Sequence, residues 1–158
     1  MKRIWHMLML LLKRDGFQRA QYIKRHNLFK KIGVDCYYHP FHIPTESWLV
    51  SLGDNVVIAT GVELITHDMS YALLSKDKIL NEVIGPGKYP YYTGKITIGN
   101  NVMIGANVLI LPDVTIGNQV VIGAGSIVAK DIPSGVVVAG CPAKIIGSYY
   151  SFAKKRKY

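Results

Sequence analysis

The most regular feature of the chain is an aliphatic residue at every sixth position. From residue 98 onward the sequence divides into six consecutive hexads: IGNNVM, IGANVL, ILPDVT, IGNQVV, IGAGSI and VAKDIP. Each opens with Ile or Val, and a small residue usually follows. The same frame occurs earlier as LGDNVV, IATGVE and LITHDM, over residues 52–69. A fixed internal period of this kind indicates a solenoid, in which stacked repeats bury one continuous core.

Each hexad predicts a short strand followed by a tight corner. The aliphatic first residue points inward and stacks on its counterparts in neighbouring coils, and three hexads make one 18-residue coil with three sides. Gly and Asn suit the corners, because both tolerate a positive φ. An α-helix is excluded, because its period is about 3.6 residues and it disfavours recurrent Gly. The pattern therefore predicts an all-β fold, a three-sided parallel β-solenoid over residues 34–147.

Residues 1–33 follow a different pattern. The apolar run IWHMLMLLL at residues 4–12 is flanked by basic residues. It is too short to span a bilayer, which takes ~20 residues. Over residues 17–31 apolar and basic side chains alternate near helical spacing, which predicts one or two amphipathic helices ending near Gly33. Their apolar face either packs on the protein body or a sister subunit, or contacts a membrane interface.

Composition and charge narrow the possible partners. The chain is 49% hydrophobic and 18% charged, which is typical of a globular protein. Its net charge of +9 is concentrated at the two ends: residues 1–31 carry nine Lys or Arg and one acidic residue, and residues 154–157 are KKRK. A nucleic-acid-binding protein carries its basic residues on the folded face that contacts the ligand, so we expect no nucleic-acid partner. The basic leader and the basic tail, residues 148–158, are either merely solvated or attracted to an anionic surface.

The cysteines and histidines indicate the cellular compartment and whether the chain can bind a metal ion. Cys36 and Cys141 lack a metal-ligand spacing, and no secretory signal with a cleavage site is visible. We therefore expect free thiols and a cytoplasmic protein. A γ-type carbonic anhydrase, which is also a β-solenoid, needs three His ligands around zinc. His67 is the only histidine from residue 43 onward, so no metal site is expected.

Two stretches of the chain carry a resemblance to a known family. Residues 94–147, GKITIGNNVMIGANVLILPDVTIGNQVVIGAGSIVAKDIPSGVVVAGCPAKIIG, resemble the hexapeptide-repeat acyltransferases. Residues 48–68, WLVSLGDNVVIATGVELITHD, resemble the sugar O-acetyltransferases among them, including polysaccharide, galactoside and maltose enzymes. The resemblance covers roughly residues 45–147. It implies a left-handed parallel β-helix, acetyl-CoA as acyl donor, and a homotrimer with sites between subunits.

The hexad pattern stops after residue 69 and resumes near residue 96. In the family the catalytic base is a histidine at the point where a long loop leaves the coil, and His67 matches that position. The loop is residues 68–95. Neutral imidazole can accept the proton of a sugar hydroxyl while that oxygen attacks a thioester, and the resemblance implies direct transfer without an acyl-enzyme. Asp68 either caps the loop or contacts the acceptor.

The resemblance also implies a donor site. Ala106 and Ala124 match corner positions where small side chains allow the pantetheine arm of CoA to approach the backbone. Lys130 and Lys144 match basic residues that contact the CoA phosphates in relatives.

Two further residues are candidates for substrate contact. Met103 stands where the galactoside and maltose enzymes carry an aromatic residue near the acyl site. Residues 36–47, CYYHPFHIPTES, contain His39, His42 and Glu46, of which His39 is our candidate for contact with the acceptor.

These features predict transfer of acetyl from acetyl-CoA to a sugar hydroxyl in a polysaccharide, glycolipid or lipid-linked precursor. Alternatives are N-acetylation of an amino sugar, another small hydroxyl acceptor, or a non-catalytic solenoid that serves as a scaffold or binds glycans. The last of these predicts no affinity for CoA. The basic, apolar residues 1–31 suit peripheral contact with the inner face of a membrane.

Overall fold

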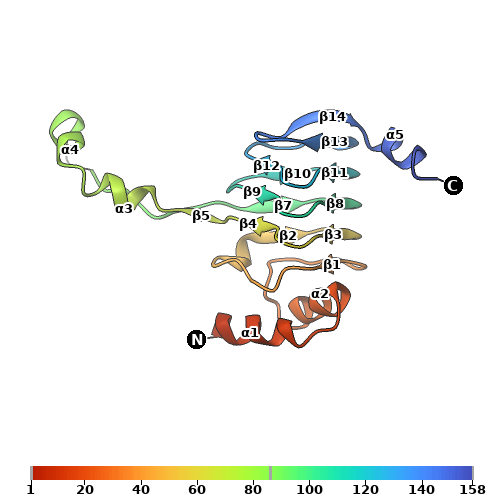
Figure 1. Cartoon of the computed structure of the whole chain (residues 1–158). Coiled ribbons are helices and arrows are strands. Elements are labelled where there is room, and N and C mark those ends of the chain that lie inside the picture. The colour runs from red at the N-terminus through yellow and green to blue at the C-terminus, as the bar shows by residue number, and fades with distance from the viewer. Residues whose placement is uncertain (1, 86, 158) are drawn as a thin grey trace.

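A computed structural model describes residues 2–85 and 87–157. Its body is a stack of coils whose short strands form three sheets, which are parallel except for the last strand of the second sheet (Figure 1). The first sheet contains β2 (Val50–Leu52), β7 (Ile96–Ile98) and β10 (Thr115–Ile116). The second contains β1 (Tyr37–Tyr38), β3 (Val56–Ile58), β8 (Val102–Ile104), β11 (Val120–Ile122), β13 (Val136–Ala139) and β14 (Lys144–Ser148). The third contains β4 (Glu63–Leu64), β9 (Leu109–Ile110) and β12 (Ile127–Val128).

The chain visits the three sheets in turn and rises by one coil on each circuit. Leu52 pairs with Ile98, which pairs with Ile116, so the first residues of successive hexads stack directly. All three side chains are 2% exposed or less. Asn101 and Asn107 occupy corners with φ of 58°, as their tolerance of positive φ predicts. The parallel stacking of hexads that the sequence predicts is confirmed.

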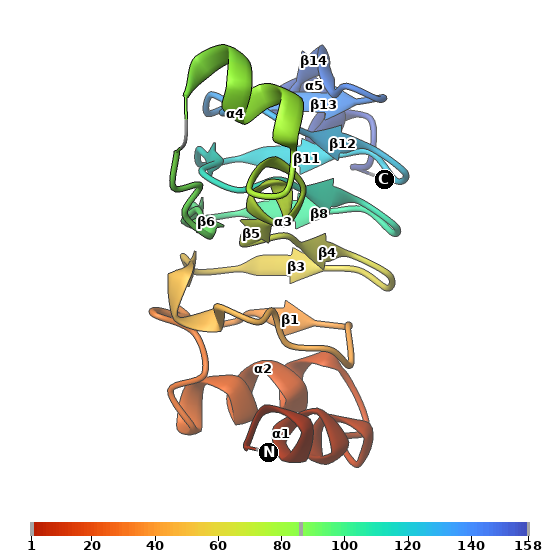
Figure 2. The ribbon, with the colours of Figure 1, turned by 90° about the vertical axis from the view of Figure 1, so that its left-hand side faces the viewer.

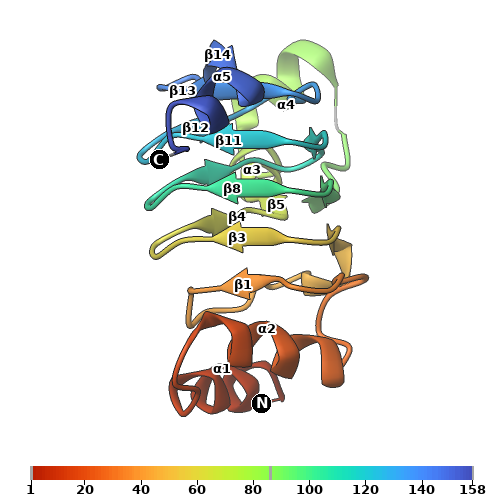
Figure 3. The same ribbon diagram turned by 90° about the vertical axis from the view of Figure 1, so that its right-hand side faces the viewer.

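The solenoid begins one coil earlier than the regular hexads. Tyr37 of β1 pairs with Val57, and Lys31 forms a bridge with Ser51, so residues 31–49 make a first coil. A short 3₁₀ helix, η1 (Ser47–Leu49), ends this coil. Figure 3 shows β1 in line with the later strands of the second sheet. Buried Tyr38 and Ile43 fill the interior that hexads fill elsewhere.

Two helices close the open end of the first coil (Figures 1 and 3). They are α1 (Lys2–Leu11) and α2 (Gly16–Arg25), so the helical segment ends before the predicted Gly33. Leu10 and Ile23 are fully buried and belong to the same hydrophobic core as the coils. The buried Arg19 ties α2 to the first coil by donating from Nε to the carbonyl oxygen of Tyr38 at 3.0 Å. The helices are therefore part of the body.

Residues 67–93, here called the arm, project sideways from the stack (Figures 1 and 2). The arm is more ordered than the predicted loop over residues 68–95. Its ends, β5 (His67–Asp68) and β6 (Tyr92–Thr93), pair as an antiparallel ladder, and α3 (Ser70–Leu74) and α4 (Lys78–Ile84) lie between them. After the arm, β7 resumes parallel pairing with β2, so the excursion leaves the stack undisturbed.

The chain ends at the opposite end of the solenoid from α1 (Figure 1). There β14 pairs antiparallel with β13, and α5 (Tyr149–Lys154) carries the first residue of the basic KKRK segment. Within residues 2–85 and 87–157, every helix is too short or too polar to cross a membrane.

Candidate active site

His67 and Glu46 form a hydrogen-bonded pair at the base of the arm. His67 lies just after the third sheet, and Glu46 precedes η1 in the coil beneath. The distance between His67 Nδ1 and Glu46 Oε2 is 2.8 Å. The Glu46 side chain is 7% exposed, whereas that of His67 is 29% exposed. The carboxylate is thus buried behind an imidazole that solvent can reach.

Glu46 accepts two further hydrogen bonds. The Thr66 hydroxyl donates to Oε2 at 2.7 Å, and the Tyr91 hydroxyl donates to Oε1 at 2.9 Å. Burial acts to raise the pKa of Glu46, but the hydrogen bonds from Thr66, His67 and Tyr91 outweigh it and lower that pKa. Glu46 is therefore ionised at neutral pH.

The ionised carboxylate fixes the tautomer of His67. A carboxylate only accepts hydrogen bonds, so Nδ1 of His67 must carry the proton that they share. In a neutral imidazole the lone pair then resides on Nε2. This is the arrangement that a general base requires, with the buried acid also stabilising the imidazolium that forms when Nε2 takes a proton.

The arm supplies an aromatic wall beside His67. The Tyr91 ring centroid lies 5.3 Å from that of His67, and the Tyr71 ring packs edge-on to Tyr91 at 5.5 Å. Partial desolvation and the Glu46 carboxylate raise the pKa of Tyr91 to about 12. Tyr91 therefore stays protonated and remains a hydrogen-bond donor to Glu46 across the physiological range.

Two aspartates accept hydrogen bonds at the base of the arm. Asp68 Oδ1 accepts from the backbone N–H and the hydroxyl of Ser70, at 2.9 and 2.5 Å, and these bonds lower the pKa of Asp68. Of the two roles expected for Asp68, this geometry supports capping. Asp113, at the equivalent corner one coil higher, accepts from the Tyr92 hydroxyl and from the Lys95 N–H. The base of the arm is thus held to the coil above through Asp113 and to the coil below through Tyr91 and Glu46.

His39 lies on another side of the solenoid. It follows β1, and its backbone N–H donates to Ile58 in the second sheet at 2.9 Å. Its ring lies between those of Tyr37 and Phe41, and its Nδ1 is buried without a partner among the described residues. In the part of the chain that the structure describes, it is Glu46, from the same segment, that contacts His67.

The predicted donor residues divide between two edges of the solenoid. Ala106 and Ala124 stack at the corner between the second and third sheets, where the Gly125 N–H donates to the Ala106 carbonyl at 2.8 Å. A Cβ at Gly105 would lie 2.6 Å from the Ala124 nitrogen, so this corner admits no side chain there. Met103 precedes this corner on the outer face of β8 and is 39% exposed.

Lys130 lies on the same edge as His67, two coils higher, at the corner that follows β12. Lys130 and Lys144 both line a pocket of about 330 Å³ at the C-terminal end of the stack. The structure thus brings the two lysines together, and the two alanines together, but places the alanines on a different edge from His67.

Comparison with known proteins identifies the family. The family described as "Bacterial transferase hexapeptide (six repeats)" matches residues 95–130, and "Hexapeptide repeat of succinyl-transferase" matches residues 50–64. Protein CapG of Staphylococcus aureus is 40% identical over 130 residues, which are 79% of this chain and 69% of CapG. The chain belongs to the hexapeptide-repeat acyltransferase family.

A curated galactoside enzyme and a solved galactoside enzyme structure are also similar to this chain. The galactoside O-acetyltransferase of Escherichia coli K12 is 42% identical over 113 residues, which are 70% of this chain and 50% of that enzyme. This chain thus spans about half of its length. A solved structure titled galactoside acetyltransferase in complex with coenzyme A superposes with a TM-score of 0.63 and 31% identity, over 97% of this chain and 83% of that one.

The sequence singled out one half of the His67–Glu46 pair. The break in the hexads placed His67 at the edge of the coils, and the family resemblance suggested its role as base. Glu46 was named only as a neighbour of His39, and Thr66 and Tyr91 were not singled out as partners. The available signal was an acidic residue in a segment that must pack directly beneath His67. Among residues 2–85 and 87–157, no group of three or more His, Cys, Asp or Glu is placed to hold a metal ion.

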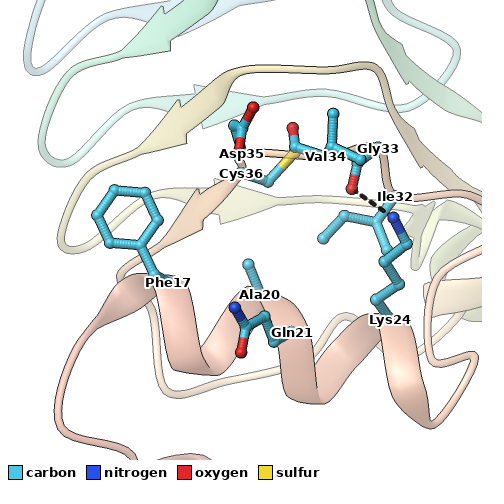
Figure 4. A pocket seen from close by; sticks show the side chains of 9 residues that line it. All are labelled: Phe17, Ala20, Gln21, Lys24, Ile32, Gly33, Val34, Asp35 and Cys36. Atoms are coloured by element: carbon cyan, nitrogen blue, oxygen red, sulfur yellow. Dashed lines mark hydrogen bonds between the residues drawn. The ribbon is translucent and has the colours of Figure 1, made fainter.

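A separate hollow of about 290 Å³ lies between α2 and the first coil (Figure 4). At its rim Lys24 Nζ donates to the Gly33 carbonyl at 3.1 Å. Cys36 lines it, and burial raises the pKa of the Cys36 thiol, which makes it a poor nucleophile. Both cysteines of the acyltransferase are free, as the sequence predicts.

Proposed function

We propose that this acyltransferase transfers an acetyl group from acetyl-CoA to a hydroxyl of a sugar, in a polysaccharide, glycolipid or lipid-linked precursor. The observation that carries the proposal is the His67–Glu46 pair, partly exposed at the base of an arm. The similarity to a galactoside O-acetyltransferase and to a galactoside acetyltransferase structure that contains coenzyme A supports the choice of acceptor and donor.

His67 acts as the general base. Its Nε2 takes the proton of the acceptor hydroxyl as that oxygen bonds to the acetyl carbonyl carbon. The carbon–sulfur bond then breaks, and the departing thiolate takes the proton back from Nε2 to leave as free CoA. Glu46 holds Nδ1–H throughout and stabilises the transient imidazolium, while Tyr91 and Thr66 hold Glu46.

The donor occupies a groove between subunits of a homotrimer of left-handed β-helices. This arrangement is favoured because the candidate donor residues lie on two edges of one chain: Ala106 and Ala124 on one, Lys130 and the base His67 on another. Adjacent subunits bring unlike edges together. The small alanines allow the pantetheine arm to approach, and Lys130 and Lys144 supply cations for the CoA phosphates.

The arm supports the trimer. Four of its apolar side chains are at least 65% exposed in the single chain: Leu73, Ile79, Val83 and Ile84. Such a cluster is uncommon on a monomer surface and typical of an interface. A neighbouring subunit would cover it and would place the arm over the groove.

Substitution of one histidine tests the function. We expect His67→Ala to fold, to bind acetyl-CoA with unchanged affinity in calorimetry, and to lose about 10²- to 10⁴-fold in the rate of CoA release with a sugar acceptor. The matched control is His42→Ala, because His42 pairs with the exposed Glu63 on the surface. A wild-type chain that binds neither acetyl-CoA nor CoA would overturn the proposal, as would a fully active His67→Ala.

A further inference from the structure

The helix α1 has an apolar face on each side. One side packs inward: Leu10 is fully buried, Met7 packs against the core, and His6 Nδ1 lies 2.9 Å from the Tyr22 hydroxyl. The opposite side of α1, together with Leu12 directly after the helix, is here called the basal face; its five large apolar residues are Ile4, Trp5, Leu8, Leu11 and Leu12. Each of them is between 50% and 72% exposed.

The basal face departs from the usual pattern of a surface helix. Its residues follow one helical stripe, and such a stripe on the solvent side is normally polar while the apolar stripe faces the core. Here the inward stripe already meets the core through Leu10. Among residues 2–85 and 87–157, the outward stripe is therefore left without a partner, and its apolar area favours contact with another surface.

The charge of residues 1–31 indicates the partner of the basal face. Lys2, Arg14, Lys30 and Lys31 are exposed in the same N-terminal segment. The single acidic residue of residues 1–31, Asp15, is engaged as the cap of α2 and accepts from Gln18 N at 2.9 Å. Two copies of this end would repel each other, whereas an anionic surface is complementary to it.

We propose that the basal face binds the surface of an anionic membrane, with α1 lying in the plane of the interface. A helix of 10 residues cannot span a bilayer but suits this position, with its apolar side among the acyl chains and its basic neighbours at the headgroups. Trp5 suits the interfacial depth, because its ring is apolar and its indole N–H is polar.

This contact orients the molecule. Figure 1 shows α1 across one end of the stack, with α5 and the C-terminal end at the other. The coils would therefore rise from the membrane, and the basic residues 154–157 would face away from it. His67 lies in the second coil, one strand spacing of about 4.8 Å above the coil that the helices cover. An acceptor held at the membrane would then reach the proposed active site; that consequence alone rests on the proposed function.

Sedimentation with lipid vesicles tests the proposal on the full-length chain. We expect binding to vesicles that contain phosphatidylglycerol and little binding to phosphatidylcholine alone. The variant Ile4→Ser/Trp5→Ser/Leu8→Ser should lose at least about tenfold in affinity, because three side chains no longer enter the interface. These residues are exposed, so the variant should keep the circular dichroism spectrum and the CoA affinity of the wild type.

The matched control neutralises the other basic end. Replacement of Lys154, Lys155, Arg156 and Lys157 by Ser removes four positive charges but leaves α1 intact, and it should leave vesicle binding nearly unchanged. In a Trp48→Phe background, the fluorescence of Trp5 should shift to shorter wavelength on binding. Since the chain has two tryptophans, that signal belongs to α1 alone.

Several results would overturn the proposal. One is failure of the intact chain to bind anionic vesicles. Another is an equal loss of binding in the tail variant, which would indicate unspecific charge attraction. A third is a concentration-dependent mass increase that the Ile4/Trp5/Leu8 variant abolishes, without vesicle binding, which would make the basal face an interface between copies. None of these measurements depends on acetyl transfer.

Discussion

His67 and Glu46 lie 21 positions apart, yet the distance between His67 Nδ1 and Glu46 Oε2 is 2.8 Å. The contact runs between consecutive coils, so the stacking of the solenoid itself assembles the pair. Neither residue has this partner in an isolated coil. The proposed acid–base pair is therefore a product of the repeat architecture as well as of the two side chains.

Replacing Glu46 by Gln tests its positioning role. We expect kcat to fall by about a hundredfold or more while the Kd for acetyl-CoA is unchanged, because the amide can hold the wrong tautomer of His67. Glu46→Asp should recover part of the rate, since the charge returns. Steady-state kinetics and calorimetry on the same samples separate the two effects, and a parallel loss of CoA affinity would indicate a structural role instead.

Glu46 also predicts how stability depends on pH. Its pKa in the folded state is lowered from 4.5, so its stabilising contribution is complete above pH 4.5 and is lost as the pH falls through the lowered folded value. Glu46→Gln should therefore be less stable than wild type by about 2 kcal/mol at pH 7. The difference should shrink as the pH falls well below 4.5. Urea titrations across this range measure it, with Glu82→Gln, an exposed residue of the arm, as control; a pH-independent gap would contradict the argument.

Lys130 and Lys144, at the C-terminal end of the stack, are each expected to contribute to the affinity for CoA. Lys130→Ala and Lys144→Ala should each raise the Kd for CoA by about tenfold, because each removes a charged hydrogen bond to a phosphate. Lys30→Ala, at the other end of the stack, is the matched control and should bind normally. Calorimetry with CoA and dephospho-CoA would show which phosphate each lysine contacts; unchanged affinity in both variants would place the phosphates elsewhere.

The exposed apolar side chains of the arm predict the assembly. Light scattering on the wild-type protein should give three times the chain mass of 17.6 kDa. Ile79→Ser/Val83→Ser removes two of these side chains, which are 73% and 76% exposed, and should shift the mass toward the monomer and lower activity. The substitution Ile145→Ser/Ile146→Ser, at exposed positions of β14, serves as comparison. A trimer that persists in the arm variant would show that the arm does not hold it together.

The coils follow from the sequence because their pattern is local. Inward residues such as Ile98 and Ile116 recur at a fixed spacing, and that spacing alone determines which side chains face the core. The same spacing shows where the coils are interrupted, next to His67, but the role of His67 as base was predicted from the family resemblance. The first coil was harder to predict, since Tyr38 and Ile43 fill its interior without a hexad frame.

The contact of Glu46 with His67 and the exposure of the basal face could not be predicted from the hexad pattern, for a different reason. The partner of His67 is chosen by which coil stacks beneath it, and that alignment is a property of the assembled fold. For α1, a run of apolar residues on nearly every side does not reveal which side the core will cover. The structure resolves the choice by burying Leu10 and leaving Trp5 outside.

The ladder at the base of the arm has a consequence for how new specificities arise. His67 pairs with Thr93, Asp68 pairs with Tyr92, and β7 rejoins β2 in register immediately afterwards. The excursion is thus closed at its base, and the contact of Tyr91 with Glu46 is a further point at which the segment between these strands is tied to the coils. Such a segment can be exchanged: grafting it from one relative to another, with Tyr91 retained, should alter which acceptor is admitted while the proposed base His67 and the proposed donor lysines stay in place. Diversification of acceptors can therefore proceed without any redesign of the stack.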